Sequence, residues 1–105
     1  MNIENASLGF AAIGSPQRLS VLLMLVKAGR LGMNVGQIQE ESGMAPSTLA
    51  HHLRMLADGD LITQRRDGRT VINRANFDHL ETLGSYLLRE CCANETIETK
   101  KGDAA

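Results

Sequence analysis

Two cysteines stand side by side in this chain of 105 residues, Cys91 and Cys92, and they are the only ones it has. Two cysteines placed at random in such a chain would be neighbours about one time in fifty, so chance is a poor explanation of the pair. Soft thiolates select thiophilic ions, and two adjacent thiols can bind one trivalent arsenic or antimony centre. The pair therefore predicts a binding site for a thiophilic ion.

A second group of functional residues lies in a helix predicted over residues 46–58. Its core-facing stripe at about 100° per residue consists of leucines, Leu49, Leu53 and Leu56. The opposite side carries hydroxyl, imidazole and guanidinium groups, on Ser47, Thr48, His51 and Arg54. Such a face suits the major groove of DNA, because short side chains let the backbone approach and the longer donors reach base edges and phosphates. His52 falls toward the core side and is expected to pack rather than to contact DNA.

Three arginines, Arg65, Arg66 and Arg69, flank the tip of a predicted β-hairpin. Asp67-Gly68 separates two β-prone runs, residues 61–66 and 69–74, and Asp-Gly favours a type I′ turn, in which both central residues have positive φ. Cations at such a tip can contact phosphate or enter the adjacent minor groove. A hairpin that is merely well hydrated is the alternative, and the helices before it favour the DNA-binding interpretation.

Caps and chain breakers predict the helices that position these groups. Ser15 before Pro16 starts a helix that Gly29 ends, and Asn34 caps a short helix that stops at Gly43. The predicted helices cover residues 3–13, 15–28, 35–42, 46–58 and 76–93. Two short helices joined by a turn with glycine form a helix-turn-helix, and a hairpin directly after it makes a winged helix.

The last predicted helix would carry both cysteines. On it, Cys91 shares a stripe with Leu80, Leu83, Gly84 and Leu87, which we expect to lie in a dimer interface, and Cys92 is turned by about 100°. Adjacent thiols on a helix cannot close a relaxed disulfide, because the eight-membered ring disfavours helical backbone. The polar remainder is predicted to be disordered, which gives one domain over residues 1–93 and a tail over residues 94–105.

Composition and charge exclude several classes of protein. The longest apolar run, residues 21–26, is far short of the roughly 20 residues of a membrane span, and the first residues lack a secretory signal, so we expect a cytoplasmic protein without membrane contact. The net charge is −1, but residues 46–74 hold five arginines against three aspartates, which places any DNA surface there. A phosphate loop, a metalloprotease helix, a nucleophile elbow and a Cys-x-x-Cys motif are all missing, so an enzyme is not expected.

Three segments together resemble the ArsR/SmtB family of small bacterial repressors: IGSPQRL at 13–19, MAPSTLAHHL at 44–53 and GRTVI at 68–72. The resemblance covers about residues 10–92 and implies a mainly α winged helix-turn-helix with a small β-hairpin. It also implies a homodimer held by the first and last helices, binding to double-stranded operator DNA, and release when an inducer binds. By symmetry the operator is an imperfect palindrome with half-sites about 34 Å apart.

The cysteine pair is similar to that of the family branches that respond to arsenicals or antimonials through a vicinal pair in the last helix. This likeness implies trivalent antimony or arsenic, including methylated arsenic, as the inducer bound by Cys91 and Cys92, with no permanently bound cofactor. The cysteines that the founding arsenic repressors carry at the start of the helix-turn-helix are absent from residues 34–38.

Four alternatives stay open at this point. Zinc could bind through Asp78, His79 and the cysteines, or the thiols could sense oxidants or persulfides. The two cysteines could also be small buried hydrophobic residues at a helix end. Finally, a winged helix could bind another protein instead of DNA.

Overall fold

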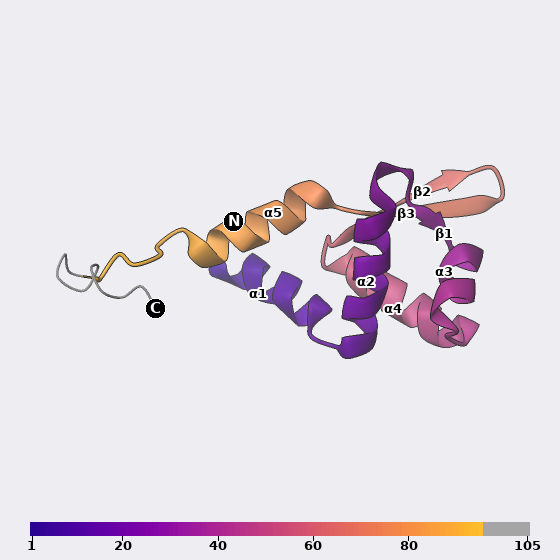
Figure 1. Ribbon diagram of the computed structural model, residues 1–105, viewed down its shortest axis with the longest axis horizontal. Helices are drawn as coiled ribbons and strands as arrows, with labels where there is room; N and C mark the ends of the chain where they lie inside the picture. The colour runs from indigo at the N-terminus through magenta and orange to yellow at the C-terminus, as the bar shows by residue number, and fades with distance from the viewer. Residues whose placement is uncertain (96–105) are drawn as a thin grey trace.

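The computed structural model describes residues 1–95, so the predicted tail lies outside the described residues except for its first two. The helices are α1 (Ile3–Ile13), α2 (Pro16–Ala28), the 3₁₀ turn η1 (Gly29–Leu31), α3 (Val35–Ser42), α4 (Pro46–Asp58) and α5 (Phe77–Leu88). The strands β1 (Met33–Asn34), β2 (Ile62–Asp67) and β3 (Thr70–Ala75) form an antiparallel sheet in the order β1-β3-β2 (Figure 1). The predicted fold, a mainly α winged helix-turn-helix, is confirmed; the short strand β1 was not predicted.

The elements form a body and an arm (Figure 1). Helices α2, α3 and α4 pack with the sheet in the body, while α1 and α5 run alongside each other away from it. Their contact is close at Gly9, where an added Cβ would come within 2.8 Å of Leu83 Cδ1. The absence of a side chain at Gly9 therefore lets α1 and α5 approach.

The core is aliphatic, as the composition predicts. It joins the apolar sides of α2, α3 and α4 to the base of the β2–β3 hairpin, and its members include Val21, Leu22, Leu25, Ile38, Leu49, Leu53, Leu56, Leu61 and Ile62. Because a helix of about 3.6 residues per turn can bury only one side in such a core, the other side of α4 is left to solvent.

The helix starts follow the predicted caps. The Ser15 side chain accepts a hydrogen bond from the Arg18 N–H at 3.3 Å, and Asn34 forms a capping box with Gln37 in which both bonds are 2.8 Å. Such caps stabilise a helix by about 1 kcal/mol. The Arg18 side chain also closes the end of α1, since its Nε donates to the carbonyl oxygen of Ala12 at 2.7 Å. Arg18 thereby ties the arm to the body.

The hairpin turn differs from the prediction by one residue. Asp67 pairs with Thr70, so the two-residue loop is Gly68-Arg69 and not Asp67-Gly68. Gly68 has φ of +66° and neither Asp67 nor Arg69 has positive φ. Glycine alone with positive φ at the first central position is the pattern of a type II′ turn, so the predicted type I′ turn is wrong. As a result Arg69 lies in the loop itself.

The last helix is shorter than predicted, because α5 ends at Leu88. The following residues form turns: the Cys91 N–H donates to the Leu88 carbonyl at 2.8 Å, and Cys92 has φ of +64°. Every side chain from Leu87 to Glu95 is exposed, so no burial stabilises further helical turns. The expectation that Cys91 and Cys92 lie on the helix is therefore wrong.

Two glycines with positive φ give a matched test of how the chain packs on β3. An added Cβ at Gly32 (φ +67°) would collide with the carbonyl oxygen of Asn73 and approach Ile72 Cγ2 to 3.0 Å, whereas at Gly29 (φ +69°) it would meet nothing within 4 Å. Both alanine variants should lose about 1–3 kcal/mol to backbone strain, since both glycines combine positive φ with an extended ψ, and Gly32→Ala should lose clearly more. Urea denaturation measures the free energy of unfolding. Equal losses in the two variants would contradict the close approach.

Candidate nucleic-acid interface

Helix α4 has the two-sided character that the sequence predicts. The leucine stripe is inside the core, with Leu49 and Leu56 at 0% and Leu53 at 3% exposure. The predicted DNA-contacting side chains are all exposed on the other side: Ser47, Thr48, His51 and Arg54. The structure thus brings these four residues onto one open surface of the helix, and their contact with DNA stays a prediction.

His52 is buried on α4, where the sequence placed it. Its Nδ1 has no hydrogen-bond partner among the described residues. Burial lowers the pKa of His52, and the nearby charges of Arg18 and then His51 lower it further. The ring is therefore kept neutral at pH 7 and is inaccessible to a ligand of the open surface.

The hairpin of β2 and β3, called the wing below, has two faces that carry different arginines. Cross-strand partners lie on the same face of a sheet, and Arg65 pairs with Ile72 while Arg66 pairs with Val71. The inner face, toward α4, carries Gln64, Arg66, Val71 and Asn73, and the outer face carries Thr63, Arg65, Ile72 and Arg74. Because a strand alternates its side chains, Arg65 and Arg66 lie on opposite faces of the wing, and their contact with DNA stays a prediction.

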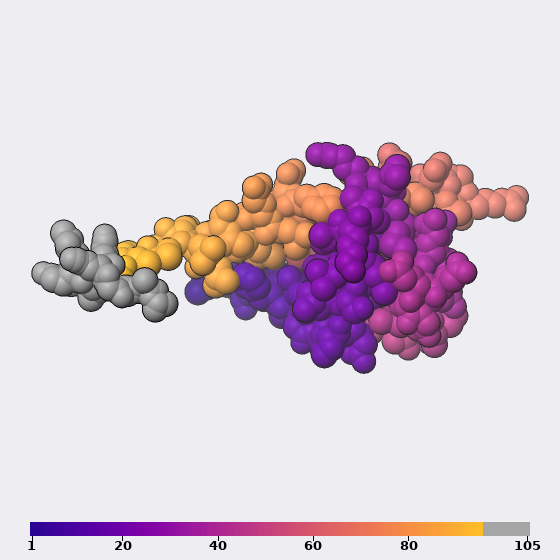
Figure 2. Space-filling model, viewed as in Figure 1, coloured from indigo at the N-terminus to yellow at the C-terminus, as the bar shows by residue number. Residues whose placement is uncertain are grey.

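Between α4 and the inner face of the wing lies a hollow of about 360 Å³. It is lined by Val35, Ala50, Leu53, Arg54, Ala57, Asp58, Gln64 and Val71. The hollow connects the open surface of α4 to the inner face of the wing, whose tip stands clear of the body (Figure 2). The open surface of α4 and the inner face of the wing therefore border the same hollow.

Asn73 anchors the wing to the body and was not predicted from the sequence. Its side chain is completely buried; Oδ1 accepts a hydrogen bond from Gln64 Nε2 at 2.8 Å, and Nδ2 donates to the Met33 carbonyl at 3.3 Å. The only signal was an asparagine inside a β-prone run, a residue type that strands disfavour. Because a buried amide needs partners, this network holds β1, β2 and β3 in register.

The cysteines lie together beyond the end of α5. Both are exposed, and their Sγ atoms are 3.3 Å apart. Hydrogen bonding with Cys91, and next with Glu95, raises the pKa of the Cys92 thiol. Neither cysteine is buried within the single chain, so a ligand from solvent can reach both sulfurs there.

The other predicted metal ligands are not brought to the cysteines. Within residues 1–95, no three side chains of the types His, Cys, Asp and Glu gather in a way that could hold a metal ion. A zinc site of Asp78, His79 and the cysteines is thus not assembled within the described part of one chain.

In residues 1–95 no single helix has the length and hydropathy to cross a membrane. Helix α1 taken with α2 and η1 meets that test only as a pair bent by 95°.

Comparison with known sequences gives a match to the helix-turn-helix domain family over residues 13–65. Nodulation protein NolR of Rhizobium meliloti is 34% identical over 76 residues, which are 71% of this chain and 60% of NolR. The chain thus spans about three fifths of that relative. Transcriptional repressor SdpR of Bacillus subtilis (strain 168) is 29% identical over 79 residues, which are 75% of this chain and 84% of SdpR.

Solved structures share the fold. An ArsR-like transcriptional regulator from Rhodococcus sp. RHA1 superposes with a TM-score of 0.79 at 20% identity and covers 97% of this chain and 96% of its own. A homodimeric winged helix-turn-helix DNA-binding domain from Mycobacterium bovis does so with a TM-score of 0.68 at 22% identity, over 89% and 84%. The chain therefore belongs to the helix-turn-helix domain family. Structures of ArsR-type transcriptional regulators share its winged-helix fold.

The lowered pKa of His52 predicts a pH dependence of stability. Above its ordinary value of 6.5 the ring is neutral in both states; as the pH falls below 6.5, the unfolded chain binds the proton first. The free energy of unfolding should therefore fall between pH 6.5 and the lowered folded-state pKa. His52→Gln should flatten this slope, and His79→Gln, which removes a histidine from α5, is the control. Urea denaturation at several pH values measures it; parallel curves for wild type and His52→Gln would contradict the assignment.

Proposed function

We propose that this protein is a dimeric transcriptional repressor that binds palindromic operator DNA through α4 and the wing. The observation that carries the proposal is the open side of α4, which lies opposite the buried leucine stripe and next to the inner face of the wing. Ser47 and Thr48, near the start of the helix, allow close approach to the bases. His51 and Arg54 donate to base edges and phosphates.

The charge of α4 supports its place in the major groove. The helix has 13 residues, and its only acidic residue, Asp58, is the last of them. The end that would approach the DNA therefore combines small hydroxyl side chains with the positive end of the helix dipole, which favours phosphate. Arg66 on the inner face and Arg69 in the loop would then reach the neighbouring backbone or the minor groove.

The apolar surface of the arm supports a homodimer. Exposure remains high at Ile3 (68%) and Leu8 (64%) on α1 and at Leu87 (67%) and Leu88 (65%) on α5. Apolar surface of this kind on two adjacent helices fits a second copy of the same pair. The homodimeric relative from Mycobacterium bovis supports this arrangement. Two-fold symmetry then sets the half-sites about one helical turn, roughly 34 Å, apart.

As inducer we propose a trivalent arsenic or antimony compound bound by Cys91 and Cys92. Two exposed sulfurs 3.3 Å apart are placed to bind one soft ion together. Methylated arsenic needs only two thiols; arsenite or antimonite would add a hydroxide or a group of the partner subunit. Binding would release thiol protons and act on DNA affinity through the arm, a coupling of typically about 1–3 kcal/mol.

Thiol oxidation is a second candidate for the signal, and the end of α5 at Leu88 favours it. The objection to a disulfide between neighbouring cysteines holds for a helix, whereas Cys91 and Cys92 lie in turns where Cys92 has positive φ. A peroxide could oxidise the pair: one thiolate attacks oxygen to form a sulfenic acid, and the second displaces water to close the S–S bond. The peroxide is reduced to two molecules of water.

The wing arginines give the first test. Replacing Arg65, Arg66 and Arg69 with glutamine should lower the slope of log affinity against log salt by about one unit for each phosphate that the protein no longer neutralises. Fluorescence anisotropy with operator DNA measures the slope. The control is Arg89→Gln. This residue directly follows α5, outside the wing, and its guanidinium group is stacked on the Tyr86 ring. A triple variant with the salt dependence of the wild type would contradict DNA binding by the wing and favour a protein partner.

The cysteines give the second test, an operator-release assay with arsenite, methylarsenite, antimonite, zinc, a persulfide donor and hydrogen peroxide. We expect trivalent metalloids to release the wild type, whereas Cys91→Ser and Cys92→Ser should each lose the response because one thiol alone holds the ion weakly. The same variants without inducer should bind the operator like the wild type. Release by zinc alone would contradict the metalloid proposal, and release only by peroxide or persulfide would establish thiol oxidation instead.

A further inference from the structure

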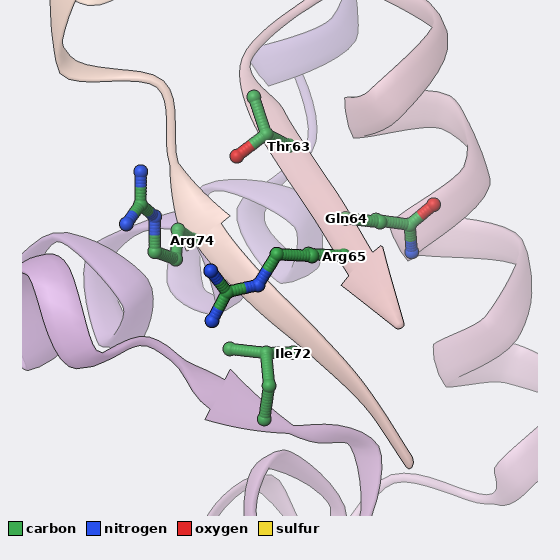
Figure 3. A pocket seen from close by; sticks show the side chains of 5 residues that line it. All are labelled: Thr63, Gln64, Arg65, Ile72 and Arg74. Carbon is green, nitrogen blue, oxygen red and sulfur yellow. The ribbon is translucent and has the colours of Figure 1, made fainter. Parts of the chain in front are cut away.

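The outer face of the wing holds a hollow of about 240 Å³, and of the residues that line it only Arg65 is among the predicted DNA contacts. It is lined by Thr63, Gln64, Arg65, Ile72 and Arg74 (Figure 3). Figure 3 shows Arg65 and Arg74 on the same side of the sheet with the Thr63 hydroxyl, while the Gln64 side chain points the other way. The hollow therefore belongs to the face turned away from α4.

Its lining is suited to an anion. Two guanidinium groups line it and no carboxylate does. Like charges that share a hollow repel each other, and an anion between them removes that cost. Guanidinium groups bind phosphate oxygens in pairs of parallel hydrogen bonds, and a hydroxyl such as that of Thr63 adds a further donor.

Arg74 is held in place by the chain that crosses β3. Its Nη1 donates to the carbonyl oxygen of Arg30 at 3.4 Å, and its side chain is half-buried. Gly32 lies so close to β3 that an added Cβ would come within 2.6 Å of Arg74 Cγ. The neighbouring Asn73 is fixed by its buried hydrogen bonds. Arg74 is thus a positioned donor on a rigid strand, which lowers the entropic cost of binding.

The size of the hollow limits the ligand. At about 240 Å³ it is smaller than the roughly 300–1,000 Å³ of sites that enclose drug-sized molecules. A single phosphate group has a suitable size and charge. Such a group could come from the DNA backbone or from a free phosphate compound.

We propose that the outer face of the wing binds a phosphate group between Arg65 and Arg74, and that the DNA flanking each half-site supplies it. That DNA supplies this phosphate rests on the proposed function. The wing tip stands clear of the body (Figure 2), and a hairpin at a minor groove has one strand's backbone on each side. Arg66 then faces the backbone nearer α4, and Arg65 with Arg74 faces the outer one. The wing would straddle the groove.

The test compares two operator duplexes, one trimmed at the outer edges of the half-sites and one extended by about ten base pairs on each side, a full turn. Fluorescence anisotropy gives the affinity and salt slope of wild type, Arg74→Gln, Arg74→Lys and the control Lys27→Gln. We expect extension to tighten wild-type and Lys27→Gln binding. Arg74→Gln should lose this gain and about one unit of salt slope per wing, but bind the trimmed duplex like wild type. Arg74→Lys should regain only part of it, since Lys cannot bind in the bidentate way.

A second arm uses inorganic phosphate alone, followed by NMR of the arginine Nε–H signals of the DNA-free protein. Loss of the extension gain in Arg74→Gln supports the DNA backbone as the source. If Arg74→Gln abolishes phosphate binding but still binds the extended duplex more tightly than the trimmed one, the site is supported. Its ligand is then a free phosphate compound. An Arg74→Gln variant that matches wild type in both arms overturns the proposal. Failure of the wild type to bind either duplex would instead overturn the proposed function, and the phosphate arm would still test the site.

Discussion

Burial of one side of α4 is the constraint on which the rest of the surface depends. Leu49, Leu53 and Leu56 are almost completely inside the core. Shortening one such leucine to alanine typically costs about 2–5 kcal/mol, a large part of the roughly 5–15 kcal/mol that stabilises a small domain. The helix therefore has little freedom to turn about its axis, and the polar side with His51 and Arg54 is held outward. The side chains proposed to read DNA are thus positioned by apolar contacts that they do not make themselves.

The wing depends on a polar contact in the same way. The buried amide of Asn73 links Gln64 on β2 to the Met33 carbonyl on β1, and Gly32 lets the chain pass closely over β3. Once the register is set, strand alternation determines that Arg66 lies on the inner face and Arg65 on the outer face. One rigid hairpin thereby presents cations in two directions, toward the α4 surface and away from it.

Sequence signals that act within a few residues were sufficient to predict most of the fold. They were not sufficient for the features that contacts between distant residues determine. The caps Ser15 and Asn34 and the leucine spacing of α4 act within a few residues, so α2, α3 and α4 could be predicted. The position of the hairpin turn could not be predicted, because Asp67-Gly68 and Gly68-Arg69 both contain the needed glycine. The pairing of β3 with β2 selects between them. The end of α5 and the partner of Asn73, 40 residues away, depend on tertiary packing. The cysteines were therefore recognised as a pair but placed on a helix that does not reach them.

Methylation interference on operator DNA can show whether a dimer places two copies of α4 in successive major grooves. Dimethyl sulfate methylates N7 of guanine in the major groove and N3 of adenine in the minor groove. We predict that guanine methylation prevents binding within two tracts whose centres are about ten base pairs apart, on one side of the duplex. Interference confined to adenine N3, or to a single tract, would contradict this placement of α4.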